Sequence, residues 1–384
     1  MPLSGKRVVI QPNISRRGWP CHAGSRALEN FVALEDSTVL ARLMQAGAHL
    51  AGNSRMSELG FGLSGDTTIQ ILVEKKADIA LMTDTMGDAR AAAAGAGMFG
   101  FKPSWGVVSR FGLIGLVPSM ECCGVAAEDI QDIIGVMKAI AGKDERDFSM
   151  PDEESPDFSA VGKSPAGACR AGVIREMLSL LADEDRGLFR ENLEKLENAG
   201  VEITEVSFPE FDLFRTAHQV IAAVEASSSA GKYDGVRYGY RSPGAKNWND
   251  MYLNSRGESF GTLIKGFLFQ GAYFQFENYA AFENAGRIRR RLVRDMANLF
   301  REIDVLVSPT RRIAKKEAAA SDVRGVYDAF LLTLPANLTG QPALQIPGQA
   351  PAGKDTGVQL TALRLDDARL LALGERLTFS QEAA

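Results

Sequence analysis

Residues 83–90 of the chain read TDTMGDAR, and residues 100–113 read GFKPSWGVVSRFGL. The apolar run Asp78–Met82 directly before the first stretch is typical of a buried parallel strand. Small residues from Ala91 to Ala94 favour a tightly packed helix after it. Asp88 stands just before this helix, where a carboxylate is stabilised by the helix N-terminus. The pattern therefore predicts a strand, a tight turn and a helix, with an acidic side chain where the turn meets the helix.

The same kind of alternation continues along the chain. Helical spacing of apolar residues follows Ser37, a candidate helix cap, and recurs later. The expected strands are Lys6–Gln11, Asp78–Met82, Arg170–Val173, Val201–Phe208 and Asp304–Ser308, and the expected helices include Ile69–Lys76, Glu128–Ala141, Leu188–Asn198, Asp212–Ser228 and Tyr273–Arg301. Strands that alternate with helices predict an α/β fold with a mostly parallel, mixed sheet and helices on both faces.

Composition narrows the class of protein. The chain has 384 residues, of which 45% are hydrophobic and 24% charged, with a formal net charge of −5. Such a balance gives no electrostatic footprint for non-specific binding of nucleic acid. No apolar run reaches the length of a membrane-spanning helix, and the N-terminus lacks the pattern of a secretory signal. Four cysteines without a regular framework, and three histidines without metal-ligand spacing, lead us to expect a cytoplasmic protein without disulfides, metal or other cofactor.

The two opening stretches resemble SDTGGSIR and GLKPTYGRVSRFGL of the amidase signature family, and further motifs extend the resemblance. Residues 36–62 resemble the family's DATVVxxLKxAGAIIxGKTNMDEFAMG, and residues 304–310 and 334–348 resemble DVLVTPT and IPANLAGLPAISVP. The branch that looks most similar is the one formed by the A subunits of glutamyl-tRNA(Gln) amidotransferases. The resemblance implies the α/β/α amidase signature fold in a single domain over residues 1–384. That domain is shortened at its N-terminus relative to the family.

The resemblance also assigns three positions to the family's catalytic groups, which are a Ser nucleophile, a second Ser on a cis peptide and a Lys base. Residues 2–14, PLSGKRVVIQPNI, resemble PLAGIPIAIKDNI, which places Gln11 at the Lys position. Residues 62–68, GLSGDTT, resemble GGSSGGS, which places Ser64 at the cis-Ser position, and the spacing from there places Asp88 at the nucleophile position. The loop residues Thr85, Met86 and Gly87 take the place of the family's substrate-binding and oxyanion-binding turn.

Two of the three groups are thus replaced. A Gln amide is not a useful base near neutral pH, and loss of a nucleophile–base unit typically costs on the order of 10⁴ to 10⁶ in rate. A carboxylate at Asp88 is an anion in a position where the family binds an anion, so it is expected to occupy that hole itself. The sequence therefore predicts a homologue without ordinary amide hydrolase activity that acts by binding a ligand or partner. The alternative is an enzyme that uses Asp88, with Ser64, for a different acyl or C–N reaction.

Three further groups of residues have both a functional and a structural interpretation. Asp66, Asp84 and Asp88 offer carboxylates for a cation, but an Asp at the position of Asp84 is expected to hold the loop. Cys122 and Cys123 are a conceivable thiol nucleophile, and buried structural cysteines are the favoured interpretation. The basic run Arg287–Arg291 is interpreted as a scaffold helix with a solvated face. The expected partners are a small molecule in the former amidase cleft and a second copy or a different partner chain, with no membrane or nucleic acid.

Overall fold

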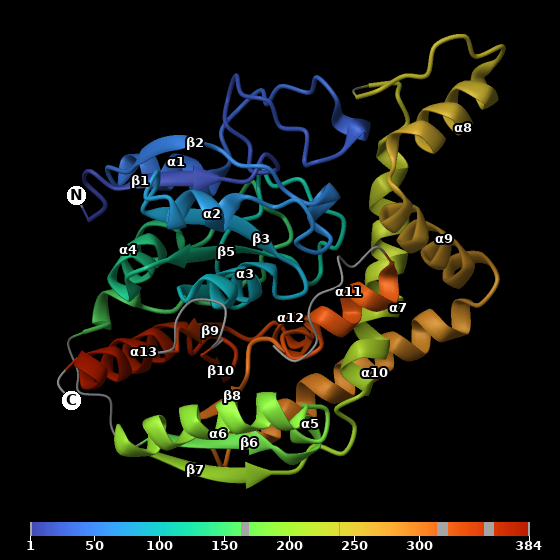
Figure 1. Ribbon diagram of the computed structural model, residues 1–384. Coiled ribbons are helices and arrows are strands. Elements are labelled where there is room, and N and C mark those ends of the chain that lie inside the picture. The colour runs from blue at the N-terminus through green and yellow to red at the C-terminus, as the bar shows by residue number, and fades with distance from the viewer. Residues whose placement is uncertain (1, 163–168, 238, 313–321, 349–356, 383–384) are drawn as a thin grey trace.

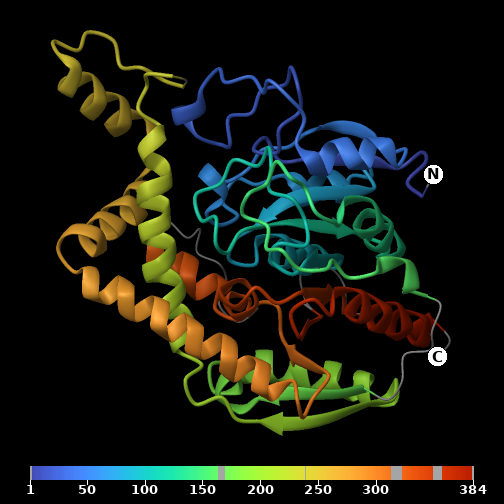
Figure 2. The same ribbon diagram turned by 180° about the vertical axis from the view of Figure 1, so that it is seen from behind.

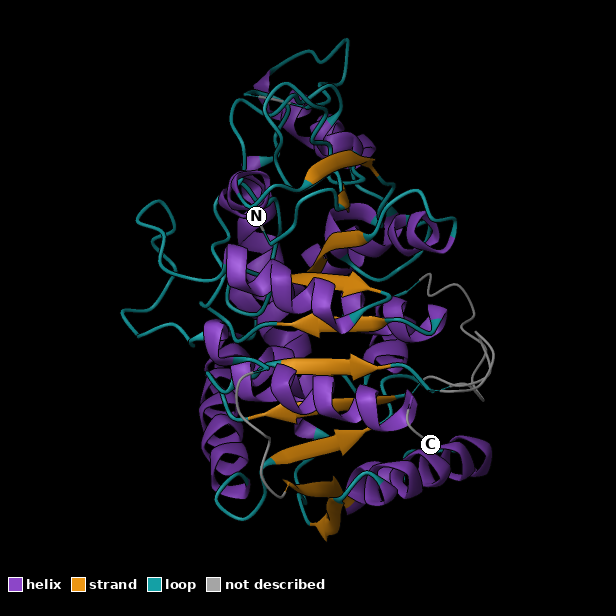
Figure 3. Cartoon of the chain, turned by 90° about the vertical axis from the view of Figure 1, so that its left-hand side faces the viewer, coloured by secondary structure: helices purple, strands orange, loops and turns teal. Residues whose placement is uncertain are grey.

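The computed structural model describes residues 2–162, 169–237, 239–312, 322–348 and 357–382. Alternating strands and helices form one continuous ten-stranded sheet with helices packed on both of its faces (Figures 1 and 3). The strands are β1 Arg7–Ile10, β2 His49–Asn53, β3 Ile79–Asp84, β4 Phe99–Lys102, β5 Cys122–Ala127, β6 Cys169–Ile174, β7 Val201–Val206, β8 Val305–Ser308, β9 Ala343–Ile346 and β10 Val358–Ala362.

Between most of these strands, the chain forms one or more α-helices. Ser37 accepts a hydrogen bond from Leu40 N–H and begins α1, as its position in the sequence predicts. The α-helices are α1 Thr38–Gln45, α2 Thr68–Val73, α3 Asp88–Ala96, α4 Ile130–Ile140, α5 Arg175–Leu178, α6 Asp183–Asn198, α7 Leu213–Ser229, α8 Trp248–Ser259, α9 Thr262–Phe276, α10 Tyr279–Leu299, α11 Val323–Phe330, α12 Leu334–Thr339 and α13 Asp367–Glu382.

The sheet is mixed, as expected, but its middle is antiparallel. Its order is β2-β1-β3-β5-β4-β9-β10-β8-β6-β7. Parallel pairs stand at the two ends, in β2–β1–β3 and β8–β6–β7, whereas every pair from β3 to β8 is antiparallel. The expectation of a mostly parallel sheet is therefore wrong for the centre. The expectation rested on strands near the two ends of the sheet. The strands β4, β5, β9 and β10, which form its centre, were not predicted.

The period-two alternation of the strands divides the core between the two faces. Ile79 and Leu81 of β3 belong to the larger hydrophobic cluster, which includes α1, α4 and α13. Ala80 and Met82 belong to a smaller cluster with α2 and α3. The helix α3 thus lies directly against the sheet, where Gly100 of β4 and Gly124 of β5 leave room for it: a Cβ on Gly124 would lie 2.6 Å from the Ala89 side chain.

The helices α7 to α10 form a separate layer at one side of the sheet (Figures 1 and 2). The long α7 packs against α9, α10 and α12, and α10 crosses it. The expected single helix over Tyr273–Arg301 is two helices, because the chain leaves helical geometry at Asn278, with φ −140° and ψ 58°. The helix α7 of this layer reaches the turn between β3 and α3, and α11 contacts α7 there.

Candidate active site

The turn between β3 and α3 is held in a conformation that requires glycine. Gly87 has φ +119°, and a Cβ at this position would lie 2.1 Å from Oγ1 of Thr333. The Thr333 hydroxyl donates to the Met86 carbonyl oxygen at 2.5 Å. Thr333 thus fixes the turn from the side of α12, and any side chain at Gly87 would displace it.

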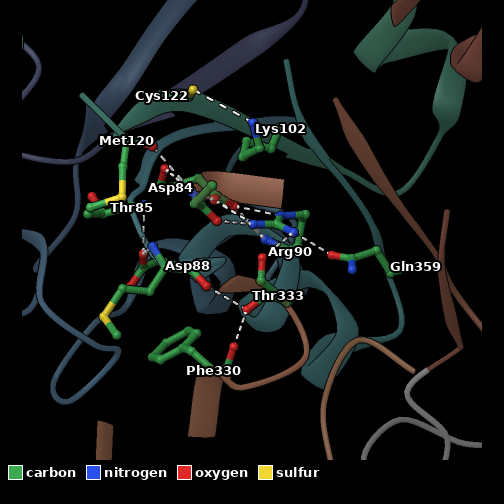
Figure 4. Close-up of polar contacts among 12 residues, drawn as sticks. Asp84, Thr85, Asp88, Arg90, Lys102, Met120, Cys122, Phe330, Thr333 and Gln359 are labelled. Atoms are coloured by element: carbon green, nitrogen blue, oxygen red, sulfur yellow. Dashed lines mark hydrogen bonds and ion pairs between the residues drawn. The ribbon is translucent and has the colours of Figure 1, made fainter. Parts of the chain in front are cut away.

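Asp88 is the first residue of α3, and its carboxyl group folds back over the turn (Figure 4). Its Oδ2 accepts hydrogen bonds from the backbone N–H groups of Thr85 and Met86, each at 3.0 Å. Its Oδ1 is buried and has no hydrogen-bond partner among the described residues. The carboxyl group therefore lies on the backbone donors of the turn, as the sequence predicts for an anion at this position, and Oδ1 keeps an unused capacity to accept a hydrogen bond.

The surroundings of Asp88 disfavour its charge. Burial, and then the negative charge of Asp84, raise the pKa of Asp88 to about 7, against the opposing effect of the two backbone donors. The carboxyl group is consequently present in both protonation states at neutral pH, which suits a group that accepts and returns a proton.

Asp84, at the end of β3, is also buried, but its surroundings favour its charged form. The guanidinium of Arg90 donates to both of its oxygens, from Nη2 to Oδ1 at 2.9 Å and from Nε to Oδ2 at 3.1 Å. Asn337 adds a donor to Oδ1 at 3.0 Å, and the Arg90 guanidinium also contacts Gln359, Asn337 and the Thr333 carbonyl (Figure 4). Burial opposes ionisation, but the Arg90 cation and these donors lower the pKa of Asp84 below its ordinary value. Asp84 holds the loop, as expected, and does not face a cation site.

Gln11, at the expected Lys position, is bound to its neighbours through both ends of its amide. Its Oε1 accepts from the Thr83 N–H at 2.8 Å and from the Thr83 hydroxyl at 3.1 Å, and its Nε2 donates to Asp66 Oδ2 at 2.6 Å. Burial raises the pKa of Asp66. The structure thus brings together Gln11, Asp66 and the strand that leads to Asp88.

Ser64 lies two residues before Asp66 on the same loop and is exposed. Its hydroxyl makes no hydrogen bond to Gln11, Asp88 or any other described residue. The structure therefore joins Gln11 to the β3 end of the site and leaves Ser64 on the solvent side. The role of each position in catalysis stays a prediction.

His218 of α7 is a site residue that the sequence did not reveal. Its imidazole is fully buried, with Nε2 at 3.1 Å from the Thr85 carbonyl oxygen and Nδ1 at 2.9 Å from the Tyr327 hydroxyl of α11. Burial lowers the pKa of His218 to about 4. No spacing pattern could have found it, because 133 residues separate it from Thr85.

The other candidate groups have structural surroundings. Cys122 and Cys123 are buried in β5, where burial raises the pKa of Cys122 and raises that of Cys123 to about 12, which disfavours a thiolate nucleophile. Lys102 Nζ lies 3.9 Å from Cys122 Sγ and donates to the Pro103 carbonyl at 2.8 Å. Across the described ranges, no three His, Cys, Asp or Glu side chains gather as a metal site would require.

The basic run of α10 serves the scaffold. The guanidinium of Arg289 donates to the Leu338 carbonyl at 2.8 Å and to the hydroxyl and carbonyl of Ser119 at 2.7 Å each. Arg291 pairs with Glu210. Among the described helices, none combines the length and the apolar character that crossing a bilayer would need.

Comparison with known proteins places this geometry in a family. A model of the Amidase family matches residues 1–74 and 71–371. The chain is 32% identical over 404 residues to the glutamyl-tRNA(Gln) amidotransferase A subunit of Lactobacillus johnsonii, and the match covers 97% of this chain and 83% of that protein. The corresponding A subunit of a Prochlorococcus marinus strain is 35% identical over 400 residues, 96% of this chain and 82% of that protein.

Solved structures show the same fold. The glutamyl-tRNA(Gln) amidotransferase A subunit of Thermotoga maritima superimposes with a TM-score of 0.78 at 24% identity, over 97% of this chain and 83% of that one. The native peptide amidase of Stenotrophomonas maltophilia gives a TM-score of 0.78 at 21% identity, over 99% of this chain and 83% of that one. The predicted amidase signature fold is thereby confirmed.

These relatives contradict the function that the sequence analysis predicted. Proteins about one-third identical to this chain, over nearly all of it, are named as the A subunits of amidotransferases. The prediction of a binding protein without amide chemistry is therefore wrong, and so is its alternative of a different acyl or C–N reaction. It gave the expected replacement of the Ser and Lys positions more weight than the similarity of the whole chain. By the matches to its sequence and its fold, this chain belongs to the amidase family.

Proposed function

We propose that this chain performs amide chemistry, in which it releases nitrogen from a carboxamide, and that it works as the amide-processing subunit of an amidotransferase-type assembly. The support is the similarity to amidotransferase A subunits along nearly the full chain. A partner chain belongs to the proposal because those relatives are named as subunits. We also propose that residues 1–384 act as a single domain, while a cytoplasmic location remains a prediction.

Asp88 is the proposed catalytic residue. In its ionised form, Oδ1 takes a proton from a water molecule, whose oxygen attacks the carbonyl carbon of the amide. The C–N bond then breaks, and the protonated Asp88 returns its proton to the departing nitrogen. The products are a carboxylic acid and ammonia, so that one water is consumed for each amide. The observation that carries this role is the buried, unpartnered Oδ1 on a carboxyl group whose pKa is about 7.

The other predicted positions receive supporting roles in this proposal. Gln11 positions the end of β3, because both polar ends of its side chain already have protein partners in Thr83 and Asp66. Ser64 binds the substrate, because it is exposed and its hydroxyl has no partner among the described residues. The N–H groups of Thr85 and Met86 stabilise the ionised form of Asp88, and Gly87 lets the turn adopt the required geometry.

The test is ammonia release from a panel of primary carboxamides, including glutamine, asparagine and simple aliphatic amides. We expect turnover by the unmodified chain and a loss of about 10² to 10⁴ in kcat/KM for Asp88→Asn, the range typical of a general acid–base group. Ser64→Ala is expected to raise KM. Asp152→Asn is the matched control, because Asp152 is an exposed carboxylate that pairs with Lys143 at the surface.

Two outcomes would count against the proposal. Absence of ammonia release from every amide would contradict the function. Release that is as fast in Asp88→Asn as in the unmodified chain would contradict the role of Asp88 and leave the function intact.

A further inference from the structure

Two buried polar side chains meet behind the turn that carries Asp88. His218 of α7 and Tyr327 of α11 are both fully buried; they contact each other, and His218 also contacts the Thr85 carbonyl. The two rings lie edge to face, with centroids 5.6 Å apart. Burial of two polar groups is costly unless their hydrogen bonds are made, so the partners of this pair matter.

The hydrogen-bond partners fix the direction of each bond. A carbonyl oxygen only accepts, so His218 donates from Nε2 to Thr85 at 3.1 Å. Nδ1 of the neutral ring is then an acceptor, and the Tyr327 hydroxyl donates to it at 2.9 Å. Burial lowers the pKa of His218 to about 4 and raises the pKa of Tyr327, so that both groups keep these protonation states near neutral pH.

The bond from His218 continues to Asp88 through one peptide group. The Thr85 carbonyl and the Met86 N–H belong to the same planar peptide, so fixing the oxygen also fixes the direction of the N–H. That N–H donates to Asp88 Oδ2 at 3.0 Å. The chain of donors therefore runs from Tyr327 through His218 and the 85–86 peptide to the carboxyl group. Bonds in such a chain polarise one another and strengthen the last one.

We propose that His218, oriented by Tyr327, is a positioning residue that aims and polarises the Met86 N–H toward the reacting carboxyl group. This inference rests on the proposed function. His218 acts through the backbone. It does not contact the substrate and takes no part in proton transfer. Charged groups bear on all three side chains: Asp84 disfavours the charge of Asp88, Arg289 disfavours that of His218, and Arg215 opposes the rise in the pKa of Tyr327 that burial causes.

The experiment compares three variants in ammonia release as a function of pH. His218→Phe removes both hydrogen bonds, His218→Gln restores an N–H near the position of Nε2, and Tyr327→Phe removes only the orienting hydroxyl. Weakening a donor to the carboxylate disfavours its charged form. We therefore expect His218→Phe to move the acidic limb of the kcat profile upward by about 0.5 to 1 pH unit, and to lower kcat about 10- to 100-fold with little change in KM.

The conservative variants separate positioning from packing. His218→Gln should return the limb most of the way, and Tyr327→Phe should shift it in the same direction by less. His49→Gln and Tyr279→Phe are the matched controls, because both residues are exposed, and they should leave the profile unchanged. If His218→Phe fails to fold, the shift in Tyr327→Phe decides the question. An unshifted limb in the folded variants would overturn the proposal.

A second readout separates this inference from the function on which it rests. The Asp88 carboxyl group is followed directly by ¹³C NMR of protein labelled at aspartate carboxyl carbons, with Asp88→Asn to assign the signal. A higher Asp88 pKa in His218→Phe or Tyr327→Phe supports the positioning role even in a protein that turns over none of the amides. An unchanged Asp88 pKa in these variants overturns it, whatever the activity.

Discussion

Asp84 and Asp88 are two buried carboxyl groups four residues apart on the same turn, and the structure treats them in opposite ways. Asp84 has a cation and a neutral side-chain donor, and its pKa is lowered. Asp88 has two backbone donors on one oxygen, no partner among the described residues on the other, and a pKa of about 7. The difference shows how one short segment combines a carboxyl group that holds the fold with a second one whose surroundings suit the proposed chemistry. The first needs every polar atom satisfied, and the second needs one left available.

Breaking the Asp84–Arg90 pair should give the largest change in stability. Arg90→Met leaves an uncompensated buried carboxylate, and we expect it to lower the free energy of unfolding by about 3 to 5 kcal/mol in denaturant titrations. The double variant Asp84→Asn with Arg90→Met should be less damaging than the single Arg90→Met, because it removes both charges. A single variant that unfolds at the same denaturant concentration as the unmodified chain would contradict the structural role of the pair.

Asp88→Asn should raise the free energy of unfolding at alkaline pH, whereas Arg90→Met lowers it. Because the folded-state pKa of Asp88 is raised, its protonated form stabilises the fold, and this contribution is lost as the pH rises from about 4 through about 7. The Asn side chain carries no charge, and its N–H₂ group takes the place of Oδ1, which has no hydrogen-bond partner among the described residues. We therefore expect Asp88→Asn to be more stable than the unmodified chain at pH 8, by on the order of 1 to 3 kcal/mol, and the difference to vanish near pH 4. Thermal unfolding at the two pH values measures this, and equal stability at both would refute it.

Gln11 supplies an intermediate case, in which a neutral side chain holds the half-buried carboxyl group of Asp66. Gln11→Leu removes the donor to Asp66 and the acceptor for Thr83, and we expect a loss of about 1 to 2 kcal/mol in the free energy of unfolding. The same change should raise the Asp66 pKa further, because a donor to its charged form is lost. No loss of stability in urea would show that water replaces Gln11 at little cost.

The surface offers the smallest effect. Glu210 and Arg291 form an ion pair whose side chains are 40% and 44% exposed. Glu210→Gln should cost less than about 1 kcal/mol, because exposed pairs are screened and lose side-chain entropy. A loss comparable to that of Arg90→Met would show that burial is not what distinguishes the two pairs.

Much of the fold could be predicted from local pattern and the rest could not. The apolar run before Asp84 and the turn at Gly87 predicted the strand, turn and helix that carry Asp88. The central strands β4 (FGFK) and β9 (ALQI) escaped prediction because a Gly or a Gln interrupts their apolar residues, whereas the equally short β1 (RVVI) and β8 (VLVS) contain three consecutive aliphatic residues. The break between α9 and α10 escaped because it contains neither Pro nor Gly, so the helical pattern runs through Asn278 without a signal.

The candidate site divides in the same way. Positions 11, 64 and 88 could be proposed because the segments around them resemble motifs of the amidase signature family. The surroundings of Asp88 could not, because His218 and Thr333 contact its turn from segments far along the chain, and Tyr327 contacts His218. Sequence motifs identify Asp88 as a candidate, whereas its pKa and orientation depend on long-range packing.

Although they share one turn, Asp84 and Asp88 are expected to differ in charge at neutral pH. The most direct measurement is a ¹³C NMR titration of the aspartate carboxyl carbons from about pH 4 to pH 9, a range that spans the ordinary and the raised carboxyl pKa, with Asp88→Asn to assign the signal. We predict one buried carboxyl that titrates near pH 7 and disappears in the variant, while the Asp84 signal stays that of a carboxylate throughout. An Asp88 signal already ionised at the acidic end, or an Asp84 signal that titrates in its place, would contradict the account.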